Sequence, residues 1–166
     1  MSSLKRFCII GAIITIILGV ISHFVYEWSG NNFFVGLFFP VNESTWEHMK
    51  LLFFPMLFYA LLAGKLVEEE YSCIMNAMFT GILAGLLLIP VLFYTYTGVL
   101  GFNVDWLNIV SYVISVAGAY YVVYRVAEKC DRMDSKVLRY VMYALILAFM
   151  IFTVYPPKLG IFVNPV

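Results

Sequence analysis

Residues 6–28, RFCIIGAIITIILGVISHFVYEW, form an almost uninterrupted apolar run that decides the fold class. At about 1.5 Å of rise per residue, a helix of about 20 residues crosses the roughly 30 Å hydrocarbon layer of a bilayer. The run is long enough to do so, and it lacks the A-x-A-like site at which a signal peptide is cleaved. We therefore expect a membrane-spanning helix that stays attached to the protein.

The rest of the chain has the same apolar character. Of its 166 residues, 63% are hydrophobic and 12% are charged, whereas soluble domains are about half apolar and a quarter charged. Further runs predict spanning helices over residues 45–66, 72–96, 106–126 and 136–155. The apolar connection at 33–40 is too short to span and should lie at the interface or re-enter the membrane. The sequence predicts an all-α integral membrane protein, a bundle of five transmembrane helices forming one domain over residues 1–166.

Local signals mark where two of these helices begin. Ser44 and Glu47 form the S-x-x-E pattern of a capping box immediately before the second helix. Asp105 precedes the fourth helix and is expected to cap it.

Lys and Arg resist translocation and therefore collect on the cytoplasmic side of a membrane protein. Most of them fall at the N-terminus and in the second and fourth connections: Lys5, Arg6, Lys65, Arg125, Lys129, Arg132, Lys136 and Arg139. Only Lys50 and Lys158 fall on the other side. We expect a multi-pass protein of the cell membrane with its N-terminus inside and its C-terminus outside. Cys8, Cys73 and Cys130 would then face the reducing cytosol, so no disulfide is expected.

Composition also limits the partners. The formal net charge is zero and no long basic run is present, which argues against nucleic acid. The chain has neither a Gly-rich phosphate loop nor a G-x-S-x-G elbow, so no nucleotide is expected. The lipid bilayer is the expected partner. Gly81 and Gly85 form a close-packing face, either within the bundle or toward a second copy or another membrane protein.

Ionisable residues that the membrane should exclude gather at the predicted outer ends of the helices. The candidate polar site comprises His23, Glu27, Asn42, Glu43, Glu47, His48 and Asp105. His23 and Glu27 are four residues apart and share one helix face. Glu47 and His48 lie in the first turn of the next helix, and the connection is short enough to bring both pairs together. Charged residues in membrane helices usually mark ion paths, proton relays or substrate contacts.

Two imidazoles with several carboxylates are a ligand set that suits zinc or another divalent metal. The candidate ligands are His23, Glu27, Glu43, Glu47 and His48. A metal at this position could activate a bound water and support hydrolysis of a lipid or envelope substrate. No compact H-E-x-x-H motif is present, so the site requires the first two helices to pack side by side.

Simpler interpretations stand beside the metal site. Glu47 is explained by the capping box, Lys50 can pair with Glu47, and His23 with Glu27 can form a structural pair. The alternative function is a non-catalytic membrane subunit or partner-binding protein in which the cluster is a structural clamp. A third candidate function is a proton- or cation-coupled carrier. Such a carrier would need a charged residue deeper in the bundle, and the middle of the last three predicted helices has none.

The stretch FFPVNESTWEHMKLLFFP at residues 38–55 resembles an uncharacterised family of small multi-pass membrane proteins from Gram-positive bacteria. The resemblance extends to residues 22–28, to residues 96–101 with Asp105, and to residues 155–157. It implies a membrane location and assigns no activity. Its motif residues fall on the side where the ionisable residues gather.

Overall fold

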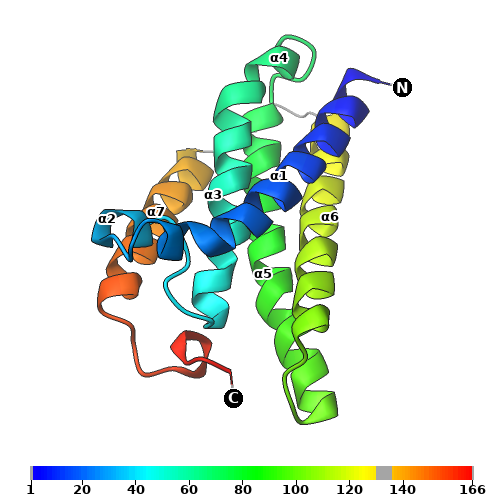
Figure 1. The fold of residues 1–166 in the computed structure, drawn as a ribbon. Helices are drawn as coiled ribbons and strands as arrows, with labels where there is room; N and C mark the ends of the chain where they lie inside the picture. Colours follow the sequence, from blue (N-terminus) through cyan, green and yellow to red (C-terminus); the bar gives the residue numbers. More distant parts are fainter. Residues whose placement is uncertain (1, 130–135, 166) are drawn as a thin grey trace.

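The computed structural model describes residues 2–129 and 136–165. Within these ranges the chain forms α-helices and one short 3-10 helix, with no strand (Figure 1). The helices are α1 Ser3–Trp28, α2 Phe33–Gly36, α3 Thr45–Ala63, α4 Lys65–Glu68, α5 Ile74–Leu100, α6 Asp105–Lys129, α7 Lys136–Val154 and η1 Gly160–Phe162. The predicted all-α class is confirmed, and the short α2 lies where an interfacial or re-entrant segment was expected.

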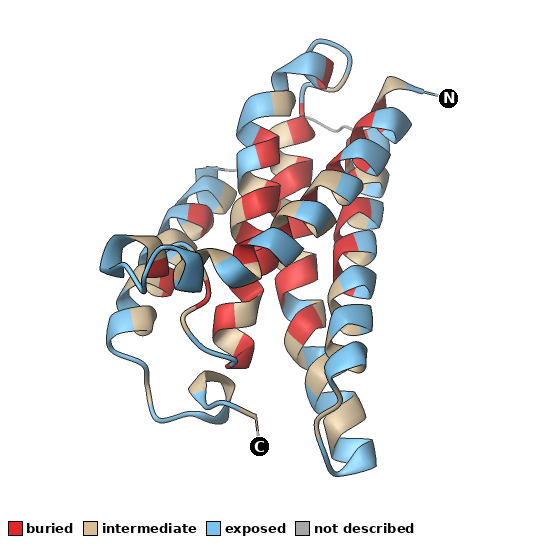
Figure 2. Cartoon of the chain, in the orientation of Figure 1, coloured by how far each residue is buried: buried red, intermediate tan, exposed pale blue. Residues whose placement is uncertain are grey.

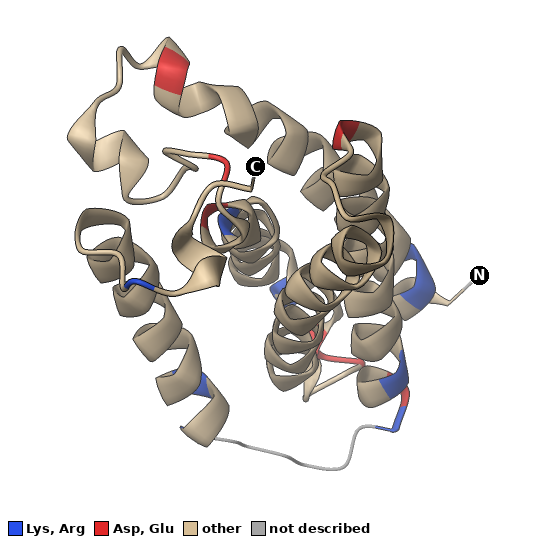
Figure 3. Ribbon diagram, turned by 90° about the horizontal axis from the view of Figure 1, so that it is seen from below, with Lys and Arg blue, Asp and Glu red and all other residues tan. Residues whose placement is uncertain are grey.

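Four helices are long and apolar enough to cross a membrane, namely α1, α5, α6 and α7. The fifth long helix, α3, is not among them, and its first two turns hold Glu47, His48 and Lys50. It is the best enclosed helix, because 11 of its 19 residues are buried (Figure 2). The structure thus supports a helical membrane protein with four candidate spans around a more polar central helix. Figure 3 shows how sparse the charged positions are along the helices.

The predicted helix starts are found with two differences. Ser44 is the N-cap of α3, and its hydroxyl accepts a hydrogen bond from the Glu47 backbone N–H at 3.4 Å. The second bond of a capping box, from the Ser44 backbone N–H to the Glu47 carboxylate, is not formed. The Ser44 N–H donates instead to Asn42 Oδ1 at 2.9 Å. Asp105, expected as the cap before the helix, is instead the first residue of α6.

Helix α1 buries a single stripe of residues at spacings of three and four, from Leu4 to Ser22, against α3 and α6. The contact of α1 with α3 and its contact with α6 differ along the length of α1. Beside Thr15 the hydroxyl of Tyr112 lies 2.9 Å from the Thr15 carbonyl oxygen and 3.1 Å from that of Leu51, and its one proton is shared between them, which ties α6 to both neighbours. A Cβ on Gly19 would lie 1.9 Å from the same hydroxyl, so the close approach needs glycine here. Beyond this crossing, α1 leads away from α6 toward α2 (Figure 1).

The predicted glycine face is filled by helices of this chain. Gly81 and Gly85 are buried on α5. A Cβ on Gly81 would meet Val123 and the Ala119 carbonyl of α6, and one on Gly85 would meet Leu52 of α3. The two glycines therefore let α5 pack closely on α6 and α3.

Aromatic side chains attach helix α7 to the start of α3. The Trp46 ring lies 4.7 Å from Phe149, 5.6 Å from Phe152 and 5.0 Å from Phe162 between centroids. This cluster joins α3, α7 and η1 into one end of the molecule.

The cysteines correct one expectation. Cys8 is free and buried, but Cys73 is disulfide-bonded, so the expectation of no disulfide is wrong. It considered only the compartment and not which cysteines the fold brings together. Cys130 and Arg132 lie outside the described residues.

Candidate metal site

His23, Glu43 and His48 come from three separate segments and meet at one point. His23 lies in the last two turns of α1, Glu43 in the connection before α3, and His48 in the first turn of α3. The Glu43 Oε2 atom is 3.5 Å from His23 Nε2 and 3.4 Å from His48 Nε2. All three ligand atoms lie within 4.8 Å of one another. The convergence of the two histidines, on which the sequence hypothesis depended, is therefore present in the structure.

The His48 ring is held by a backbone contact. Its Nδ1 lies 3.1 Å from the Ser44 carbonyl oxygen. A carbonyl only accepts hydrogen bonds, so Nδ1 carries the proton and a neutral ring leaves Nε2 with a free lone pair. The Nε2 atom is the one that faces Glu43. Metal-binding histidines typically have this arrangement, in which the second ring nitrogen donates to a backbone carbonyl or a carboxylate.

The cluster lies in the wall of a cavity of about 550 Å³ between α1, α3, α5 and α6. Much of the wall is apolar, with Leu51, Ile89 and Phe93 among its residues. Asn103, Asp105, Asn108 and Ser111 add polar groups from α6 and the turn before it. An open ligand position on a bound metal could therefore reach a space large enough for a small molecule.

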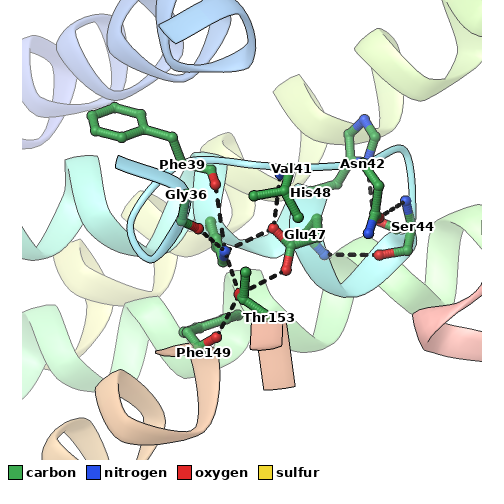
Figure 4. A network of polar contacts seen from close by, with 10 residues as sticks. Gly36, Phe39, Val41, Asn42, Ser44, Glu47, His48, Phe149 and Thr153 are labelled. Atoms are coloured by element: carbon green, nitrogen blue, oxygen red, sulfur yellow. Dashed lines mark hydrogen bonds and ion pairs between the residues drawn. The ribbon is translucent and has the colours of Figure 1, made fainter. Parts of the chain in front are cut away.

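Glu47 and Lys50 form a second cluster (Figure 4). Their side chains are 2% and 0% exposed, and Lys50 Nζ lies 2.7 Å from Glu47 Oε2. The ammonium also donates to the carbonyl of Gly36 at 2.9 Å and to the Thr153 hydroxyl at 2.6 Å. The expected pairing of Lys50 with Glu47 is thus present.

The Glu47 carboxylate has further partners. It accepts hydrogen bonds from the Val41 N–H at 3.0 Å and from the Thr153 hydroxyl at 3.0 Å. With Lys50, these contacts engage both carboxylate oxygens. Glu47 therefore joins the connection, α3 and α7, and it is not part of the group that could hold a metal.

The remaining predicted site residues have separate positions. Glu27 is exposed near the end of α1 and lies outside the converging group. Asn42 Oδ1 accepts a hydrogen bond from the Ser44 backbone N–H and so shapes the turn that carries Glu43. Asp105 lines the cavity and is exposed.

Two groups of polar residues were missed by the sequence prediction. Thr153 completes the Glu47–Lys50 cluster from a position 103 residues after Lys50. The Tyr96 hydroxyl lies beside the Oδ1 atoms of Asn103 and Asn108 and can donate its proton to either, and the Asn108 amide donates to Asn103 at 3.0 Å, beside the cavity. No local pattern links these residues, because the contacts form only after the helices pack.

Comparison with known proteins places the chain in a family. The model of a family of unknown function, DUF6512, matches residues 1–166, the whole chain. The chain belongs to this family. No curated protein and no solved structure matches it. The resemblance at residues 38–55 predicted an uncharacterised family, and DUF6512 is a family of unknown function. This membership assigns no activity. A functional proposal for this DUF6512 protein rests on the geometry of its own residues.

Proposed function

We propose that this protein is a membrane hydrolase that holds a divalent metal, best suited to zinc, between His23, Glu43 and His48. The observation that supports it is the convergence of three ligand atoms within 4.8 Å in the wall of a cavity. Catalytic zinc sites typically have three protein ligands and leave a fourth position for water or substrate. A His₂Glu set has this composition.

The distances favour a metal over direct pairing. Two atoms bound about 2.1 Å from a tetrahedral metal lie about 3.4 Å apart, and the two His–Glu distances are 3.5 and 3.4 Å. A direct bond between a charged imidazole and a carboxylate would be shorter, about 2.8 Å. The orientation of the His48 ring supports the same role. A water on the metal would ionise near pH 7 and could attack a substrate bound in the cavity.

A structural clamp is the second candidate for the same cluster. The His23 and His48 rings lie 5.4 Å apart in an edge-to-face contact, which joins α1 to α3 without a metal. However, the Glu43 side chain is 61% exposed, and an exposed pair contributes only about 0–1 kcal/mol to stability. The buried Glu47–Lys50 cluster is much better suited to clamping.

For the topology, we propose five spans with the N-terminus in the cytoplasm. The positions of Lys and Arg support it, and the Glu47–Lys50 ion pair removes much of the penalty for placing α3 in the membrane. The disulfide at Cys73 counts against it, because this arrangement places Cys73 on the reducing cytoplasmic side. The His–Glu cluster would then lie on the outer side. Attaching a reporter enzyme that works in only one compartment after residue 70, and separately after residue 102, would test this arrangement. A cytoplasmic signal after residue 70 and an outer signal after residue 102 are expected. The reverse pattern, which results if α3 does not span, or equal signals would contradict it.

Metal analysis of the purified protein tests the proposed site. We expect about one zinc per chain after incubation with zinc and removal of excess, and loss of that metal in His23→Ala/His48→Ala. Glu27→Ala is the matched control, because it removes an acidic side chain next to the cluster without removing a ligand. Unfolding of the double variant with no metal in the wild type would instead favour the clamp.

A further inference from the structure

We propose that the cavity beside the cluster binds a membrane phospholipid, which enters sideways between α1 and α6. One acyl chain would lie in the cavity, and the phosphate would reach His23, Glu43 and His48. The position of the phosphate rests on the proposed metal site, whereas the binding of the acyl chain does not.

The cavity opens toward the lipid-facing surface. Three of its lining residues are exposed apolar side chains, with Val20 49%, Phe24 45% and Ile109 61% exposed. Val20 and Phe24 lie on α1 and Ile109 on α6, and both helices are candidate spans. These side chains therefore mark an opening between α1 and α6 that faces the hydrocarbon of the bilayer.

The packing of the two helices explains why the opening exists. They are held together at Thr15, where Tyr112 and Tyr120 both bond to α1. Past this point α1 leads away from α6 (Figure 1). The result is a wedge whose closed end is Tyr112, which lines the cavity.

The walls of the wedge suit an acyl chain. The Tyr112 hydroxyl is already bonded to two backbone carbonyls, so the closed end presents mainly its aromatic ring. Leu51, Ile89 and Phe93 line the sides. An apolar space of about 550 Å³ within a membrane domain is filled more favourably by a lipid chain than by water.

The rim of the cavity suits a phosphate head. Glu43 brings one negative charge to the cluster, so a divalent metal there leaves one positive charge for an anionic phosphodiester. On the other side, Asn103 and Asn108 provide amide groups that can bond to ester or glycerol oxygens. Asp105 is exposed, so water and salt screen its charge. Phospholipids are the molecules that combine this head with an acyl chain and already surround the opening.

Lipid retention tests the proposal. The full chain is reconstituted in nanodiscs of phosphatidylcholine and phosphatidylglycerol and then re-extracted in mild detergent. Native mass spectrometry counts the phospholipids that remain. We expect one phospholipid per wild-type chain. Val20→Trp and Ile109→Trp should each block the opening, from opposite sides, and lower retention roughly tenfold, which corresponds to about 1.4 kcal/mol.

Ile17→Trp is the matched control. Ile17 is 52% exposed on α1, one turn before Val20, and does not line the cavity. It should keep the lipid. No retained phospholipid in the wild type, equal retention in all variants, or equal loss in Ile17→Trp would overturn the proposal, because the lipid would then be absent or bound only on the outer surface. Retention of a free fatty acid alone would also overturn it.

Zinc content is measured on the same samples. Val20→Trp should keep its zinc, because it changes no ligand. If the wild type retains one lipid and binds no zinc, and Val20→Trp loses that lipid, the acyl-chain site is supported and the metal site is overturned. Bound zinc with no retained phospholipid would support the metal site and overturn the lipid proposal. The two proposals therefore fail separately.

Discussion

Glu47 and His48 are neighbours in the sequence, yet their side chains belong to two different clusters. Glu47 is enclosed with Lys50 and Thr153, and its carboxylate oxygens are engaged. His48 faces a cavity and offers Nε2 to an exposed Glu43. Successive residues on an α-helix point about 100° apart, so one turn of α3 serves both clusters.

The comparison shows that similar residue types can stabilise the fold in one cluster and be available to bind a ligand in the other. A buried ion pair whose groups are all satisfied has no free position for a ligand, and removing one partner leaves an uncompensated charge. An open cluster with free lone pairs contributes little to folding and can accept a metal. Variants of the two clusters should therefore give opposite results in stability and metal binding.

The largest effect is expected for Lys50→Met. The substitution leaves the Glu47 carboxylate buried without its cation, which should cost about 3–5 kcal/mol of unfolding free energy. Thermal unfolding in detergent, followed by circular dichroism, measures the change. Glu47→Gln/Lys50→Met should recover much of the loss because both charges are removed. A Lys50→Met protein as stable as the wild type would contradict the structural role of this pair.

A smaller effect is expected from zinc. Zinc at about 100 times its dissociation constant should stabilise the wild type by about 2.7 kcal/mol. His23→Ala/His48→Ala should gain nothing from zinc, while its stability without metal stays within about 1 kcal/mol of the wild type. The stabilisation should fall as the pH is lowered, because protonated imidazoles do not bind metal. Equal stabilisation of both proteins would show that zinc binds elsewhere.

Thr153→Val tests the third member of the buried cluster. The change removes hydrogen bonds to both Lys50 and Glu47, so we expect a loss of about 1–2 kcal/mol. Zinc content should not change, since Thr153 is not one of the three candidate ligands. Chemical denaturation and metal analysis on one preparation measure both quantities. Loss of zinc in this variant would indicate that the two clusters are not independent.

The smallest effect is expected for Glu27→Gln. Glu27 is exposed and outside the ligand group, so stability should change by less than about 0.5 kcal/mol. Zinc affinity, measured by competition with a chromophoric chelator, should stay within about twofold, less than the effect expected for a group that orients a ligand. A tenfold loss of affinity would bring Glu27 back into the site.

The sequence predicted the elements that depend on local pattern. Apolar runs located the long helices, and Ser44 marked the start of α3. The meeting of His23 and His48 was also predicted, because a short connection joins two adjacent helices. Glu43 was included for its position on that connection.

Other features depend on information that a local pattern does not hold. Glu47 was grouped with His48, although adjacent helical positions face different directions. Glu27 shares a face with His23 but lies one turn further out, outside the group that meets at Glu43. Thr153 reaches Lys50 across 103 residues, and only the packing of α7 brings them together.

The inclination of α1 has a consequence for the surrounding bilayer. Its 26 residues make a rod of about 39 Å, longer than the roughly 30 Å hydrocarbon layer of a bilayer. A rod of excess length leans further in a thin bilayer and stands straighter in a thick one. Because Tyr112 fixes α1 to α6 at one point, this leaning would change the separation of the two helices at their free ends. Bilayer thickness would then set how wide the wedge stands open.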